Sequence, residues 1–143
     1  MTSNNKKHIK ASITAVGGYL PEDSISNKDL ETMVDTSDEW IKARTGIKKR
    51  RVLKEKGKGT SYLAVNAANN LLARKKIDPT TIDLVIVATI TPDFHCASTA
   101  PTVASAINAT NAYAYDISAA CSGFLFGMSS CLLYTSPSPR DNR

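Results

Sequence analysis

The segment that decides the fold leads from a predicted strand into a predicted helix through a cysteine, and it reads Asp116-Ile117-Ser118-Ala119-Ala120-Cys121-Ser122-Gly123-Phe124. Residues 112–117 predict a buried strand, and a continuous apolar run at residues 84–89 predicts a second one, covered on both faces of a parallel sheet. From Cys121 to Met128 the chain is apolar on nearly every side, which is typical of a helix buried inside a larger protein. Cys121 should therefore lie just beyond the carboxyl end of a strand, the edge at which open α/β sheets bind ligands.

The flanking segments complete an α/β pattern. A helix expected at about residues 99–107 joins the two strands, and this strand-helix-strand unit should be right-handed. Apolar residues recur every three or four positions over residues 60–76 and predict an amphipathic helix that ends in a basic cluster. Alternation of apolar and polar residues at residues 9–16 predicts a half-buried strand. We therefore expect an α/β fold with a mixed sheet.

Two helix-start signatures precede the amphipathic helix. A capping box at Ser26 predicts a short helix to about Val34, and a similar signature at residues 36–39 predicts a second one that stops at Thr45-Gly46. Thr36, Trp40 and Arg44 are spaced four residues apart, so they are expected on one face of that helix. An indole can stack on a base and a guanidinium can grip a phosphate, so the trio suits a nucleotide. A partly buried core aromatic is the alternative interpretation of Trp40.

The composition is that of an ordinary globular protein. Apolar residues make up 42% and charged residues 22% of the 143 residues, which predicts one folded domain or a piece of one. The first residues lack the apolar stretch of a signal peptide, and no run of about 18 apolar residues could cross a bilayer. We therefore expect a cytoplasmic location and no membrane partner.

The chain divides into three predicted segments. Residues 1–8 are a polar leader, and residues 9–130 carry the patterned, incomplete N-terminal domain. In residues 131–143, Pro137 and Pro139 fall where the apolar helix should continue, and proline cannot occupy a helix interior without breaking it. We expect this last segment to be non-native or the result of a truncation, a hypothesis that resequencing across codon 131 tests.

The net charge of +5 is concentrated in one segment. Its basic residues are Lys48, Lys49, Arg50, Arg51, Lys54, Lys56 and Lys58. Such a run favours an anionic partner, although a merely solvated face is the simpler interpretation of each lysine taken singly. A nucleic acid is not expected, because stacking aromatics are not interleaved with the basic residues.

Neither histidine and none of the three cysteines has the spacing of a metal site. His8 lies in the leader and His95 in a loop, so no metal is expected. Cys96, Cys121 and Cys131 would stay free thiols in a reducing compartment, which leaves room for one catalytic cysteine. Cys96 lacks a strand-to-helix setting, and the residues alone favour a packing role for it.

Three motifs occur together in a specific order. They are Asp35-Thr36-Ser37-Asp38-Glu39-Trp40-Ile41 with Arg44-Thr45-Gly46-Ile47, then Asp83-Leu84-Val85-Ile86-Val87-Ala88-Thr89, then the segment quoted at the outset. With these motifs, residues 9–130 resemble the amino-terminal portion of 3-oxoacyl-[acyl-carrier-protein] synthase III, in the thiolase-like superfamily. The resemblance implies a thiolase-like layered α/β fold of two similar halves, of which this chain supplies most of the first. It also implies a homodimer when full length.

The resemblance assigns a reaction to the chain. It implies that an acyl-coenzyme A acylates Cys121, and that malonyl-[acyl-carrier-protein] then loses carbon dioxide and attacks the acyl-enzyme to form the 3-oxoacyl product that initiates fatty acid synthesis. A helix N-terminus stabilises a thiolate, and nearby backbone N–H groups stabilise an oxyanion, so the physics agrees with this assignment. An inert packed cysteine is the alternative. No cofactor is implied.

The resemblance also assigns binding roles. It implies that Thr36, Trp40 and Arg44 contact coenzyme A and that the basic run docks the acidic acyl carrier protein. Cys96 falls where similar enzymes often place an aromatic residue that reaches across the dimer to the primer pocket, so this departure leaves the primer length open. The family's catalytic histidine and asparagine are expected downstream of this sequence, and the fragment alone is expected not to condense substrates.

Two other functions remain open at this point. One is another condensing enzyme of the superfamily, such as a hydroxymethylglutaryl-coenzyme A synthase or a secondary-metabolite starter synthase. The other is a non-enzymatic basic binding module in which Cys121 only packs. Selective alkylation of Cys121 would distinguish an enzyme from a binding module.

Overall fold

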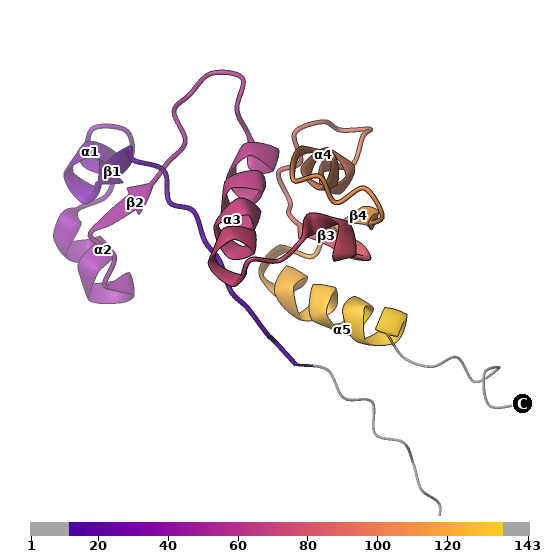
Figure 1. The fold of residues 1–143 in the computed structure, drawn as a ribbon. Coiled ribbons are helices and arrows are strands. Elements are labelled where there is room, and N and C mark those ends of the chain that lie inside the picture. Colours follow the sequence, from indigo (N-terminus) through magenta and orange to yellow (C-terminus); the bar gives the residue numbers. More distant parts are fainter. Residues whose placement is uncertain (1–11, 136–143) are drawn as a thin grey trace, which may run out of the picture.

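The predicted strands pair as a two-stranded parallel sheet in the middle of the structure, a computed structural model that describes residues 12–135 (Figure 1). Strand β3 (Leu84–Ala88) lies beside β4 (Tyr113–Ile117), with Ala88 opposite Ile117 at their carboxyl ends. Helix α4 (Thr99–Ala106) makes the crossover between them. The strand-helix-strand unit predicted from the sequence is confirmed.

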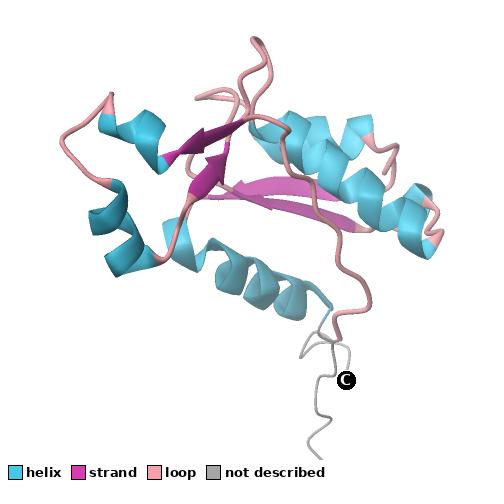
Figure 2. Cartoon of the chain, turned by 90° about the vertical axis from the view of Figure 1, so that its left-hand side faces the viewer, coloured by secondary structure: helices cyan, strands magenta, loops and turns pink. Residues whose placement is uncertain are grey.

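Helices cover both faces of this sheet. Helices α3 (Thr60–Lys75) and α4 lie on one face and α5 (Gly123–Thr135) lies on the other, so the sheet is the middle of three layers (Figure 2). The tightest packing lies between α3, α4 and the sheet, where Leu72 is 8% and Val103 is 3% exposed. Burying such a side chain fully contributes about 1.5–3 kcal/mol. This layer of the core fixes the strand ends on which the site is built.

A smaller unit precedes α3. Strands β1 (Ser24–Ser26) and β2 (Lys49–Arg51) form an antiparallel ribbon, and between them lie α1 (Asn27–Glu31) and α2 (Asp38–Thr45). The capping box is confirmed, because Ser26 and Asp29 exchange side-chain and backbone hydrogen bonds. Helix α1 ends at Glu31, before the expected Val34. Helix α2 stops at Gly46, which takes φ +69°, as expected of a glycine at a helix end.

The strand predicted at residues 9–16 is wrong over its described part. Residues 12–20 run as extended chain without strand pairing, and they pass along α3 (Figure 1). Alternation indicates one apolar face, but a strand also needs a ladder of backbone hydrogen bonds, and no described strand pairs with this segment. Ile13 and Val16 are 64% and 68% exposed as a result. Residues 9–11 lie outside the described residues.

The apolar helix after Cys121 forms, but its outer side is uncovered. Phe124, Leu125 and Leu133 are 67%, 65% and 77% exposed. The helix also runs to Thr135, five residues beyond Ser130, because the two prolines follow only at positions 137 and 139. The origin of residues 131–143 stays a prediction, and residues 136–143 lie outside the described part. Within residues 12–135, no helix has the length and apolar character needed to cross a membrane.

Candidate active site at the carboxyl edge of the sheet

Cys121 lies where the sequence predicts, between a strand end and a helix start. After β4 the chain makes one 3-10 turn at Ala120–Ser122, closed by a hydrogen bond of 3.0 Å from the Ser122 N–H to the Ala119 carbonyl. Helix α5 begins at the next residue, Gly123. The Cys121 side chain is exposed, so the thiol is accessible and does not lie in the core.

The turn around Cys121 is under backbone constraint. Ala120 takes φ +44°, a left-handed conformation that costs an alanine about 1–2 kcal/mol. Gly123 starts α5 so close to β3 that a Cβ there would lie 3.0 Å from the Cβ of Ala88. A strained turn followed by a close approach must be held by its surroundings. These two features fix the backbone on either side of the thiol.

Asp116, which the sequence marks only as part of a motif, provides one of these restraints. Its carboxylate accepts hydrogen bonds of 2.7 Å from both the Thr99 and the Ala100 backbone N–H groups. These are the first two residues of α4, whose own N-cap residue Ser98 makes no side-chain cap hydrogen bond. Asp116 therefore caps α4 from the neighbouring strand.

The loop after β3 is held in a similar way. The Asp93 carboxylate accepts hydrogen bonds of 3.1 and 3.2 Å from the Ser61 N–H at the start of α3, whose N-cap is Gly59. The Thr60 hydroxyl donates to the Thr91 carbonyl at 2.6 Å. Two helices thus begin at carboxylates supplied from the carboxyl edge of the sheet.

A cavity of about 210 Å³ opens at this edge, and its lining includes Cys96, His95, Asp116 and Ser118. Cys96 is exposed, so the packing role favoured from the residues alone is wrong. The reason is that Cys96 lies in the loop between β3 and α4, outside the core. The residues around Cys96 show neither helical nor strand periodicity, so the sequence does not predict whether this side chain is buried or exposed.

The trio proposed for a nucleotide is only partly brought together. The Arg44 guanidinium carbon lies 4.2 Å from the centre of the Trp40 ring, and both residues belong to α2. Trp40 is 53% exposed, so it is not a core aromatic. Thr36 precedes the N-cap residue Ser37 and therefore lies outside the helix, which corrects the expectation that all three share one helical face.

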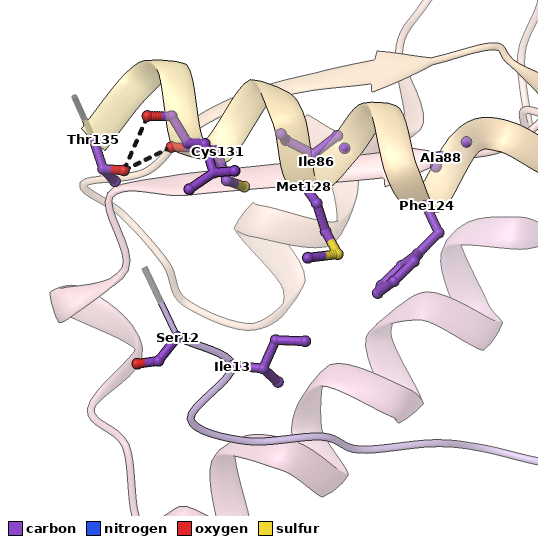
Figure 3. A pocket seen from close by; sticks show the side chains of 11 residues that line it. Ser12, Ile13, Ile86, Ala88, Phe124, Met128, Cys131 and Thr135 are labelled. Atoms are coloured by element: carbon purple, nitrogen blue, oxygen red, sulfur yellow. Dashed lines mark hydrogen bonds between the residues drawn. The ribbon is translucent and has the colours of Figure 1, made fainter. Parts of the chain in front are cut away.

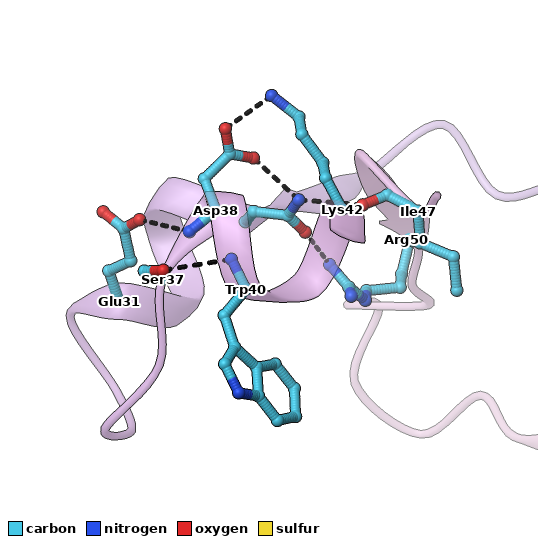
Figure 4. Close-up of polar contacts among 8 residues, drawn as sticks. Glu31, Ser37, Asp38, Trp40, Lys42, Ile47 and Arg50 are labelled. Atoms are coloured by element: carbon cyan, nitrogen blue, oxygen red, sulfur yellow. Dashed lines mark hydrogen bonds and ion pairs between the residues drawn. The ribbon is translucent and has the colours of Figure 1, made fainter. Parts of the chain in front are cut away.

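The position of α2 depends on a buried asparagine that no sequence pattern predicts. Asn27 is 1% exposed, and its amide donates at 2.8 Å to both the Asp38 carboxylate and the Ile47 carbonyl. Its oxygen accepts from the Arg50 guanidinium (Figure 4). A hydrogen bond from Lys42, and then that from Asn27, lower the pKa of Asp38. One side chain thus connects α1, α2 and β2.

Part of the basic segment is engaged within the protein. Arg50 bonds to Asn27, Arg51 donates to the Pro21 and Glu22 carbonyls, and Lys58 pairs with Glu55. Lys48, Lys49, Lys54 and Lys56 are exposed, and none forms an ion pair with a residue in the 12–135 range. These four lysines are defined here as the lysine surface.

An apolar cavity of about 550 Å³ lies elsewhere, between α5, β3 and the extended residues near Ile13 (Figure 3). Phe124, Met128 and Cys131 of α5 point toward it. None of the predicted site residues lines it. For metals, residues 12–135 contain no group of three or more His, Cys, Asp or Glu side chains placed to hold an ion.

Known proteins resemble the chain in sequence and in fold, although no protein-family model matches it. The beta-ketoacyl-[acyl-carrier-protein] synthase III of Porphyromonas gingivalis is 53% identical over 120 residues, which are 84% of this chain and 36% of that protein. The solved 3-oxoacyl-[acyl-carrier-protein] synthase III of Aquifex aeolicus superposes with a TM-score of 0.76 at 46% identity, over 82% of this chain and 37% of that one. This chain is homologous to the 3-oxoacyl-[acyl-carrier-protein] synthase III proteins over 36–37% of their length. The expected recognition and fold class are confirmed.

The other resemblances bear on the alternatives. The synthase III family members matched here are far longer, and the chain spans 36% to 38% of the first two curated relatives. A priming beta-ketosynthase from a polyketide pathway superposes with a TM-score of 0.75 at 38% identity. The protein MvaS, solved with 3-hydroxy-3-methylglutaryl coenzyme A, is only 24% identical at a TM-score of 0.74, which indicates the shared fold alone.

Proposed function

We propose that Cys121 is the acyl-accepting nucleophile of a 3-oxoacyl-[acyl-carrier-protein] synthase III and that its acyl donor is an acyl-coenzyme A. The observation that carries the proposal is an exposed thiol in the turn that joins the carboxyl end of β4 to the start of the 13-residue helix α5. The unpaired N–H groups and the partial positive charge of a helix start stabilise a thiolate without a charged side chain.

The acyl transfer follows from this geometry. The Cys121 thiolate attacks the thioester carbonyl, and the negative charge that develops on the carbonyl oxygen is stabilised by backbone N–H groups at the turn. Collapse of this intermediate forms the Cys121 thioester and expels the coenzyme A thiolate, which takes up a proton. Electrons and atoms balance without a cofactor, and none is proposed.

The nucleotide end of coenzyme A is proposed to bind at α2. Because Arg44 covers one face of the Trp40 ring, the other face is left for a base, and the guanidinium can contact a phosphate from its edge. Thr36 is proposed as a weaker contact, because it lies before the helix. Titration with coenzyme A should quench the fluorescence of Trp40, the single tryptophan.

A matched pair of variants tests this binding site. Arg44→Ala should weaken coenzyme A binding about tenfold, the loss of one charge-assisted contact, whereas Arg74→Ala, at the exposed end of α3, should leave it unchanged. Equal effects of the two variants, or no quenching in the unsubstituted chain, would argue against the α2 site.

The condensation step is proposed to need residues that this chain does not supply. The resemblance assigns decarboxylation of malonyl-[acyl-carrier-protein] to a histidine and an asparagine downstream, and His95 stands outside that motif. We therefore propose that residues 1–143 accept an acyl group but do not turn over. Steady release of radiolabelled 3-oxoacyl product from acetyl-coenzyme A and malonyl-carrier protein would contradict this.

Several finer assignments belong to the same proposal. Cys96, which lines the edge cavity, is proposed to contact the primer acyl group, and the lysine surface is proposed to dock the acidic acyl carrier protein. We also propose that the full-length protein is a homodimer and that it is located in the cytoplasm. A polyketide starter synthase would use the same acylation at Cys121, and only the remaining part of such an enzyme distinguishes the two.

Competitive alkylation tests the nucleophile. With limiting iodoacetamide at neutral pH, Cys121 should react faster than Cys96 and Cys131, all three being exposed. Acyl-coenzyme A should slow the reaction of Cys121 alone, and Cys121→Ser should abolish the fast phase. Three equal rates would favour a non-enzymatic basic binding module instead.

A further inference from the structure

We propose that Asp116 is a positioning residue for Cys121, an inference that rests on the proposed function. The Asp116 carboxylate holds the end of β4 against the start of α4 through two hydrogen bonds of 2.7 Å. Both donors belong to buried residues, since Thr99 is 1% and Ala100 is 0% exposed. A hydrogen bond to a charged group is stronger than a neutral one, and this pair is part-buried, so the attachment is well suited to fix the strand end.

The attachment lies on the backbone path to the thiol. The Ile117 carbonyl accepts from the Thr89 N–H at 3.0 Å, so the last residue of β4 is also held by β3. Three residues later comes the left-handed Ala120, and then Cys121. On the other side, Gly123 packs against Ala88. The strained turn is therefore restrained at both ends, and Asp116 supplies the restraint on the β4 side.

Asp93 provides a matched control. Its carboxylate also caps a helix whose own N-cap residue gives no side-chain hydrogen bond, but the helix is α3. Asp93 follows β3, so it is not on the path from β4 to Cys121. Loss of either carboxylate should destabilise the fold to a similar degree, and only loss of Asp116 should disturb the thiol.

The test compares Asp116→Asn with Asp93→Asn in the full chain. The thermal midpoint and the rate constant for alkylation of Cys121 are measured, the latter over a range of pH. Asp116→Asn should slow Cys121 roughly tenfold, because small displacements from a helix start or a reactive geometry have effects of this order. Its pH–rate profile should shift to higher pH. Cys96 should be unaffected, and Asp93→Asn should leave Cys121 unchanged.

Each other outcome overturns the inference. An unchanged Cys121 rate in folded Asp116→Asn, or an equal slowing by both variants, would make Asp116 only a structural cap. A different result tests the proposed function itself: if Cys121 in the unsubstituted chain is alkylated no faster than Cys96, the proposed role of Cys121 as nucleophile is wrong. That comparison needs no variant, so the two failures can be told apart.

Two further variants separate positioning from folding. Thr99→Pro removes one of the two N–H donors, and it should fold because proline is common at the first helical position and Ser98 is already extended, with φ −65° and ψ 144°. It should slow Cys121 about threefold, between the unsubstituted chain and Asp116→Asn. Ala120→Gly removes the penalty of the left-handed turn. In that background the effect of Asp116→Asn should shrink, and an undiminished effect would refute action through the turn.

Discussion

Replacing Asn27 by alanine should destabilise the unit that carries the proposed nucleotide site. The change removes three hydrogen bonds from a side chain that is 1% exposed, and two of them join Asn27 to charged groups on Asp38 and Arg50. A neutral hydrogen bond contributes about 1 kcal/mol net, and one to a charged group about 1.5–3 kcal/mol. The Asp38 side chain is 23% exposed, so water can replace part of what it loses. We therefore expect a loss of about 3 kcal/mol, somewhat below the combined range for the three bonds.

Urea unfolding followed by Trp40 fluorescence measures this loss, because the single tryptophan lies on α2 itself. Asn111→Ala is the matched control: Asn111 is exposed, and its side chain donates one hydrogen bond, to the Thr80 carbonyl at 2.8 Å. The control should lose less than about 1 kcal/mol. If the two variants lose the same amount, Asn27 does not connect α1, α2 and β2 as argued.

Three more perturbations have expected outcomes. Gly17→Ala should lower the thermal midpoint, because its Cβ would lie 2.6 Å from a side chain of α3, whereas Gly18→Ala, with open space around it, should not. Gly123→Ala should slow alkylation of the neighbouring Cys121 thiol, because the added Cβ would press on β3. Gly127→Ala, whose added Cβ would meet open space, should stabilise α5 by about 0.5–1 kcal/mol. An unchanged alkylation rate in the first variant, or a destabilised α5 in the second, would contradict these expectations. Hydrogen bonds from the side chain of Lys42, and then from that of Asn27, lower the pKa of Asp38. Its stabilisation is therefore present above the unfolded value of about 3.9 and is lost as the pH falls through the lower folded pKa, so the urea midpoint should drop as the pH is lowered below about 3.9, and less in Asp38→Asn.

The features that local sequence signals determine were predictable. The strand before Cys121 and the helix after it follow from apolar runs. The cap at Ser26 follows from a spacing of three residues. In each case the residues that form the element or the cap are near one another in the sequence, so the local pattern is enough to predict it.

The features that were missed or wrong depend on distant partners. Asn27 bonds to residues that are 11, 20 and 23 positions away, and Asp116 caps a helix that starts 17 residues earlier. A buried asparagine and a strand aspartate carry no local mark of such partners. The alternation at residues 9–16 similarly indicated an apolar face without indicating a partner strand.

Transfer of the acetyl group from labelled acetyl-coenzyme A tests the central claim most directly. The chain is incubated with the labelled thioester and digested, and the label is located by mass spectrometry. We expect one acetyl group on the peptide that contains Cys121, its retention in Cys96→Ser and its absence from Cys121→Ser. Label on Cys96 or Cys131, or none on Cys121 while Trp40 quenching reports bound coenzyme A, would contradict the assignment.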